Sequence, residues 1–124
     1  MNRPFAALAA IFACLAVACG AFGAHALQGH VDAAALQVWH TAVEYHAWHA
    51  LAMFMVALHA VAFRFGRTVL WLLAVGIILF CGSLYALALG APRSVGIITP
   101  FGGFAFIVAW ALLAFGLLKG RRGE

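Results

Sequence analysis

Two histidines and a glutamate interrupt an otherwise apolar stretch of the chain, the segment EYHAWHAL at residues 44–51. A carboxylate or an imidazole can carry a proton, and the HxxH spacing of His46 and His49 can bring two imidazoles to one metal ion. A zinc or copper ion would need further ligands, and the candidates are His25, His40 and Glu44. Proton or cation transport and metal binding are therefore the chemistries to test.

The elements that must position these groups are almost entirely apolar. Of 124 residues, 68% are hydrophobic and 8% are charged, whereas about 25% are charged in an average soluble domain. Runs of about 20 apolar residues can cross a hydrocarbon core about 30 Å thick, and four such runs lie at approximately 5–25, 38–63, 69–89 and 97–118. Because the connections are short, we expect an all-α fold, an integral membrane four-helix up-down bundle that forms a single domain over residues 1–124.

The basic residues indicate the orientation of these runs. The net charge is +4, and six of the seven Lys and Arg residues fall on one side of the predicted bundle, namely Arg3, Arg64, Arg67, Lys119, Arg121 and Arg122, against Arg93 on the other. The positive-inside rule predicts that both termini are cytoplasmic, in a bacterial inner membrane. The basic residues form no cluster that could bind the phosphates of a nucleic-acid backbone, so we expect no nucleic-acid partner. The expected partners are the lipid bilayer and a second copy or another membrane protein, because four short helices bury little surface among themselves.

The first apolar run also has features of a cleaved signal. Arg3 precedes it, and Ala16-Val17-Ala18 before Cys19 resembles a small-residue cleavage site. However, the run continues to Ala24, and Ala16 stands where a lipoprotein signal usually has a branched aliphatic residue. We therefore expect this helix to be retained.

Antiparallel helices would bring the polar residues to one depth, in the outer half of the bundle. The candidate polar site consists of His25, Glu44, Tyr45, His49, Ser83, Tyr85 and Thr99. At 1.5 Å per residue, His49 lies about 15 Å below Trp39, near the bilayer midplane. A charged side chain at the centre of a membrane helix costs about 2.5–3.5 kcal/mol. We therefore expect Glu44, Tyr45 and His49 to face the sister helices rather than lipid.

Smaller signals concern local structure. His40 and Glu44 have the i, i+4 spacing of a hydrogen-bonded pair, and Thr99 precedes Pro100 where a helix N-cap is expected. Small residues let membrane helices approach closely, and the expected packing positions are Gly20, Gly23, Gly82, Gly102 and Gly103. The three cysteines, Cys14, Cys19 and Cys81, lack metal-motif spacing and are expected to act as small apolar residues.

Several motifs follow one another along the chain. They are GAFGAH at residues 20–25, Tyr45 with His49 and Leu51 as Y-x-x-x-H-x-L, FCGSLY at 80–85, TPFGG at 99–103, and Trp110. Together they resemble the small bacterial membrane proteins of domain-of-unknown-function family 423, which is similar to the eukaryotic transmembrane protein 256. The family often has serine at Cys81, glutamine at His46 and glycine at Ala109, so the HxxH pair looks like a peculiarity of this chain, with His46 its less dependable member. The resemblance implies a four-helix inner-membrane protein that keeps its first helix and has no established biochemical activity.

Three classes of function remain open. The first is an interaction or assembly protein of the inner membrane, whose polar outer half fixes helix packing or receives a partner. The second is a small proton- or cation-conducting transporter or channel that uses Glu44 and His49. The third is a redox protein that binds haem or quinone near His25 and His49. The sequence offers no activated nucleophile, phosphate loop or carboxylate pair for hydrolysis, so we expect neither enzyme activity nor a cofactor.

Overall fold

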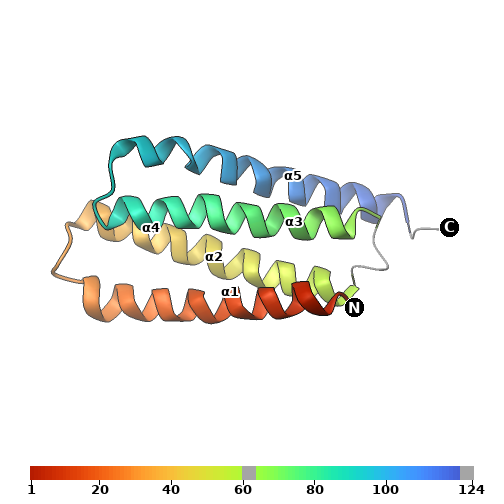
Figure 1. Ribbon diagram of the computed structural model, residues 1–124, viewed down its shortest axis with the longest axis horizontal. Helices are drawn as coiled ribbons and strands as arrows, with labels where there is room; N and C mark the ends of the chain where they lie inside the picture. Colours follow the sequence, from red (N-terminus) through yellow and green to blue (C-terminus); the bar gives the residue numbers. More distant parts are fainter. Residues whose placement is uncertain (60–63, 121–124) are drawn as a thin grey trace.

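The computed structural model describes residues 1–59 and 64–120, and most of these residues are helical (Figure 1). In chain order the elements are α1 (Arg3–Phe22), η1 (Gly23–Leu27), α2 (Ala33–His59), α3 (Gly66–Gly76), η2 (Ile77–Cys81), α4 (Gly82–Ala88), η3 (Arg93–Ile97) and α5 (Thr99–Leu118). The π-helical turns η1 and η2 extend α1 and join α3 to α4, and the 3-10 turn η3 leads into α5. The predicted all-α class is confirmed.

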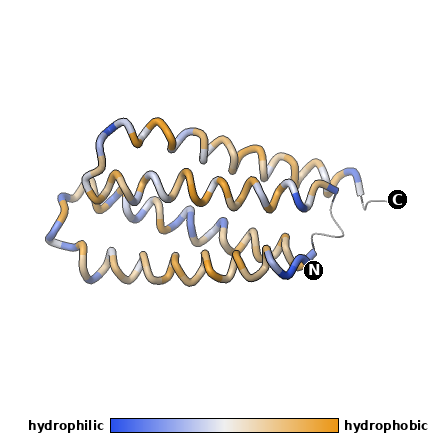
Figure 2. Tube along the Cα trace, in the orientation of Figure 1, coloured by the Kyte–Doolittle hydropathy of each residue, from blue (hydrophilic) through white to orange (hydrophobic). Residues whose placement is uncertain are grey.

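Three of the helical rods are long and apolar enough to cross a membrane: Arg3–Leu27, Gly66–Ala88 and Arg93–Leu118. The fourth, α2, has 27 residues, and its glutamate and histidines lower its mean hydropathy. Over the described residues, which end at position 59 here, it is not among these three. Figure 2 shows hydrophilic positions along α2, where the other rods are mainly hydrophobic. Residues 38–59 of the segment predicted at 38–63 are therefore helical and belong to the most polar of the four rods, whereas residues 60–63 lie outside the described part of the chain.

Capping side chains, rather than hydropathy, fix where the first two rods begin. The Asp32 carboxylate accepts a hydrogen bond from the backbone N–H of Ala35 at 2.7 Å, so α2 begins at Ala33, earlier than the predicted position 38. The Asn2 amide oxygen accepts from the backbone N–H of Phe5 at 3.3 Å and caps α1. Both caps satisfy helix N–H groups that have no partner inside the helix.

The four rods lie side by side and alternate in direction, so that α1 begins and α5 ends at the same end of the molecule (Figure 1). α1 packs along α2, α2 also packs on α3 and α4, and α5 packs on α3 and η2. The rods α1 and α5 therefore lie on either side of a central pair, which consists of α2 and the continuous rod α3–η2–α4. The core between the rods includes Met53, Leu70 and Leu73, which are fully buried.

Glycines permit the closest approaches between rods. A Cβ atom at Gly102 would overlap the backbone nitrogen of Phe80, and one at Gly23 would lie 2.6 Å from the Trp39 indole. Gly20 and Gly103 are in ordinary contact distance of a neighbouring side chain, whereas Gly82 has no such atom within 4 Å and its expected packing role is wrong. The sequence analysis missed two further close approaches, those of Gly76 and Gly116. Gly102 and Gly116 are the clearest cases, because the atoms they approach, in Phe80 and Arg64, belong to the backbone and cannot move aside.

Candidate functional site

His49 is held between α2 and α5 by a hydrogen bond on each ring nitrogen. Its Nδ1 lies 2.7 Å from the backbone oxygen of Tyr45, and its Nε2 lies 3.1 Å from the indole Nε1 of Trp110. A carbonyl can only accept and an indole N–H can only donate. The ring is therefore placed as a neutral imidazole with its proton on Nδ1, and Nε2 is occupied as an acceptor.

Aromatic rings enclose the same imidazole. The Phe106 ring stacks on it with a centroid distance of 3.7 Å and an interplanar angle of 17°. The Tyr45 ring, one turn earlier on the same helix, lies parallel to the imidazole at a centroid distance of 5.8 Å. His49 is 5% exposed, and these contacts define the first part of an inward-facing polar network.

His46 forms the second part of this network, between α2 and α4. Its Nδ1 lies 2.8 Å from the hydroxyl of Tyr85, and its ring packs edge-on against Phe12 of α1 at 6.3 Å. His46 is 4% exposed, and its Nε2 has no hydrogen-bond partner within the described residues. The sequence analysis gave His46 low weight as a metal ligand and did not predict these contacts, through which His46 joins three rods.

Two more links complete the inward-facing network. The indole N–H of Trp39 donates to the backbone oxygen of Cys19 at 2.8 Å and ties α2 to α1. The hydroxyls of Ser83 and Thr99 hydrogen-bond to each other and tie α4 to α5. Thr99 was expected to cap its helix, but no side-chain cap is present at the start of α5. The Thr99 hydroxyl instead forms the hydrogen bond to Ser83 on the neighbouring rod.

Three of the expected inward-facing residues are exposed: His25, Glu44 and, at 36%, Tyr45, whose ring still contacts Phe80 and Phe106. Glu44 and His25 are both exposed, and within residues 1–59 and 64–120 neither has a hydrogen bond to another side chain. The expected bond between His40 and Glu44 is also not formed, although both side chains are exposed on the same helix. Glu44 and His46 are separated by about 200° around a helix that turns 100° per residue. Since His46 faces the core, Glu44 must face away, and the expected inward orientation of Glu44 is wrong.

The ligand sets considered from the sequence do not come together. In the described part of the chain, no group of three or more His, Cys, Asp or Glu residues could hold a metal ion. The HxxH pair is divided between Tyr85 and Trp110, each of which takes one histidine nitrogen. A haem would need Nε2 of His49, which is occupied, and His25 lies exposed on the opposite flank of the molecule from α5. The residues proposed for haem or metal therefore do not fit such a group.

The sequence analysis missed Phe106, Phe12 and the bonding roles of Trp39 and Trp110. Tryptophan is common at membrane interfaces, so composition alone does not indicate a bonding role for either indole. A usable signal was present, because a buried indole N–H needs an acceptor and the histidines of α2 are acceptors at the depth of Trp110. The stacking of Phe106 has no sequence signal of its own in a helix rich in phenylalanine.

Comparisons with known proteins agree with the motifs. The family model described as a protein of unknown function, DUF423, matches residues 19–103. The UPF0382 membrane protein YwdK of Bacillus subtilis is 47% identical over 94% of this chain and 98% of its own length. A UPF0382 membrane protein of Haemophilus influenzae is 39% identical over 98% of both chains, and the UPF0382 inner membrane protein YgdD of Escherichia coli is 40% identical over 92% of this chain and 88% of its own. No solved structure matches the chain.

Proposed function

The chain belongs to the DUF423 family of membrane proteins, and we propose that it is an inner-membrane interaction protein that binds another membrane-embedded helix through the outer face of α2. In this proposal the molecule is an up-down bundle of four spanning helices with both termini in the cytoplasm. The inward-facing network holds the rods together. The exposed side of α2 receives the partner.

The proposed contact surface is a row of exposed side chains that we call the α2 stripe. It consists of His40, Glu44, Trp48, Leu51 and Met55. Their spacing of three or four residues places them on one face of the helix. Trp48, Leu51 and Met55 are 58%, 58% and 66% exposed, so the stripe combines one carboxylate, one imidazole and a broad apolar area.

The observation that carries the proposal is the outward position of Glu44. Tyr45, the next residue, packs against Phe80, which lies eight residues before the end of α4 and therefore about 12 Å below that end. At that depth a carboxylate on the lipid-facing surface costs up to about 3 kcal/mol. A partner that supplies a hydrogen-bond donor removes this cost. Charged groups within membrane helices are a default sign of function for this reason.

The inward-facing network gives less support to the alternatives. In a proton relay His49 would have to gain a proton on Nε2, but that nitrogen already accepts from Trp110, which can only donate. Glu44 points away from His49, so the pair does not form a continuous path. The network therefore favours a role in holding the rods, with the α2 stripe left for association.

A second copy of the chain has the chemistry that Glu44 requires. His40 is exposed one turn above Glu44 on the same stripe, so the stripe carries both a donor and an acceptor. In a two-fold symmetric contact the same surface meets itself, and each copy then offers an imidazole to the other copy's carboxylate.

The test is the oligomeric state of the protein in lipid nanodiscs, measured by native mass spectrometry for the wild type and for Glu44→Leu. Loss of the higher-mass species in Glu44→Leu, with unchanged helix content, is the expected result. Phe104→Leu, at a position 67% exposed on α5, is the matched control and should leave association unchanged. If Glu44→Leu associates like the wild type and only becomes more stable, Glu44 faces lipid and the proposal fails.

A further inference from the structure

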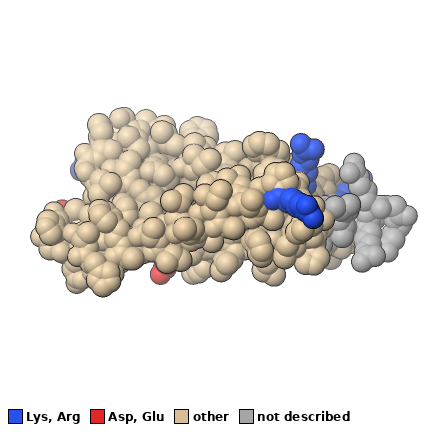
Figure 3. Space-filling model, turned by 60° about the horizontal axis from the view of Figure 1, so that its bottom comes forward, with Lys and Arg blue, Asp and Glu red and all other residues tan. Residues whose placement is uncertain are grey.

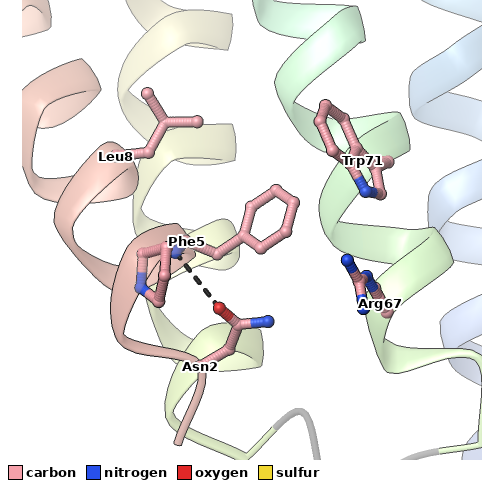
Figure 4. Close-up of a pocket in the computed structure, with 6 residues that line it drawn as sticks. Asn2, Phe5, Leu8, Arg67 and Trp71 are labelled. Atoms are coloured by element: carbon pink, nitrogen blue, oxygen red, sulfur yellow. Dashed lines mark hydrogen bonds between the residues drawn. The ribbon is translucent and has the colours of Figure 1, made fainter.

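A cavity of about 500 Å³ opens between the beginnings of α1 and α3 (Figure 4). It is lined by Asn2, Pro4, Phe5, Leu8, Arg67 and Trp71. This volume lies within the range of about 300–1,000 Å³ that small-molecule sites occupy. No residue of the inward-facing network or of the α2 stripe lines this cavity.

The polar groups of this cavity are all hydrogen-bond donors. The Asn2 amide oxygen is already used by the backbone N–H of Phe5, which leaves its NH₂ group free to donate, and Figure 4 shows that group directed toward the side of Arg67. Within residues 1–59 and 64–120, neither the guanidinium of Arg67 nor the indole N–H of Trp71 has a hydrogen-bond acceptor, and both groups can only donate. A ligand that fits must therefore bring acceptors, and a phosphate is such a ligand.

The charge around the cavity favours an anion. Figure 3 shows Lys and Arg side chains gathered at the end where α1 begins, away from the acidic side chains visible on that face. Within the described residues, Arg67 has no ion pair with a carboxylate, whereas Arg64 lies over the Phe65 ring at 5.5 Å and Lys119 over the Phe115 ring at 5.6 Å. Arg67 thus lines the cavity, whereas Arg64 and Lys119 lie over aromatic neighbours.

The other wall of the cavity is apolar and continues into the membrane-facing surface. Phe5 and Trp71 meet edge-to-face at 5.2 Å and join α1 to α3. Leu8 lies one turn deeper on α1, and Arg67 and Trp71 are one turn apart on α3. Donors at the membrane surface with apolar side chains below them match the order of a phospholipid, with its headgroup above its acyl chains.

We propose that this cavity binds an anionic phospholipid of the surrounding leaflet. Arg67 and the Asn2 amide hold the phosphate, and Phe5, Leu8 and Trp71 contact the start of an acyl chain. Basic pockets between membrane helices bind acidic headgroups in this way. The bound lipid would join α1 to α3 at an end where these rods meet mainly through one aromatic pair.

The test is lipid retention by native mass spectrometry, after extraction from nanodiscs that contain equal amounts of phosphatidylglycerol and phosphatidylcholine. The wild type should retain phosphatidylglycerol preferentially, and Arg67→Gln should reduce that retention about fivefold, as expected for one lost surface charge contact. Asn2→Asp keeps a capping oxygen for α1 but replaces the donor by a negative charge, so it should lose retention while its helix content is unchanged.

Arg64→Gln is the matched control, because it removes the same charge from the same end but not from the cavity. Equal losses in Arg64→Gln and Arg67→Gln would mean general surface attraction and would overturn the proposal. Equal retention of the two lipids by the wild type would overturn it as well. Displacement of phosphatidylglycerol by inorganic phosphate would show that the site takes the free anion instead of the lipid.

Discussion

Replacement of Trp110 by phenylalanine removes the N–H that reaches His49 but keeps an aromatic ring at the same position. The hydrogen bond is 3.1 Å long and His49 is 5% exposed, so Nε2 would be left without a partner where neither water nor lipid supplies a donor. An unsatisfied buried acceptor costs about 1–3 kcal/mol. We expect Trp110→Phe to lower the free energy of unfolding by an amount in this range.

A double-mutant cycle separates the bond from the loss of packing. His49→Leu removes the acceptor, and the double variant should lose less stability than the sum of the two single losses. Interhelical hydrogen bonds in membrane proteins have coupling energies of about 0.6 kcal/mol on average and about 1.7 kcal/mol at most, and the two bonded nitrogens of His49 place this pair in the upper part of that range.

The assay is reversible unfolding in mixed micelles of dodecylmaltoside and sodium dodecyl sulfate, followed by circular dichroism. Trp48→Phe is the control, since Trp48 is 58% exposed and has no hydrogen bond to the described residues. It should change stability by less than about 0.5 kcal/mol. If the losses of Trp110→Phe and His49→Leu add to within about 0.3 kcal/mol, the two residues are uncoupled and the inward-facing network does not hold α2 to α5.

Two further predictions use the same unfolding assay. Gly102→Ala should lower the free energy of unfolding by about 1–3 kcal/mol, because its Cβ would overlap the backbone of Phe80. Gly82 lies in open space on a helix, so Gly82→Ala should be neutral or stabilising by up to about 1 kcal/mol. Equal effects of the two substitutions would contradict the packing described for η2 and α5. Tyr85→Phe should lower the free energy of unfolding by about 1–3 kcal/mol, because His46, already unbonded at Nε2, would lose its partner at Nδ1 as well. An unchanged stability would mean that the hydrogen bond between α2 and α4 contributes nothing.

Composition and hydropathy were enough to predict the helical class and the number of long helices. The antiparallel order was enough to predict that Ser83 and Thr99 lie close together, because one lies near the end of a helix and the other begins the next. Tyr45 and His49 are four residues apart on one helix, and this spacing places their side chains in contact. These features depend on local periodicity and chain direction, which a sequence carries.

The rotation of α2 about its own axis could not be obtained in the same way. The rule that polar residues avoid lipid favours turning both Glu44 and His46 inward, but they lie on nearly opposite sides of one helix. His46 rather than Glu44 faces inward because Tyr85 and Phe12, from two other rods, pack against His46. The bond from Trp110 to His49 depends in turn on the relative depth of α2 and α5, which short loops do not fix to within one helical turn.

The central claim is that α2 presents Glu44 to a partner and not to lipid. The most direct measurement is photo-crosslinking in native membranes, with Glu44 kept and a photoreactive phenylalanine analogue in place of Trp48, which is 58% exposed one turn from Glu44 on the α2 stripe, or, separately, in place of Ile107, which is 67% exposed on α5. The account predicts a protein adduct from position 48, heavier by 13.1 kDa if the partner is a second copy, and lipid adducts from position 107. Lipid adducts alone from position 48 would contradict it.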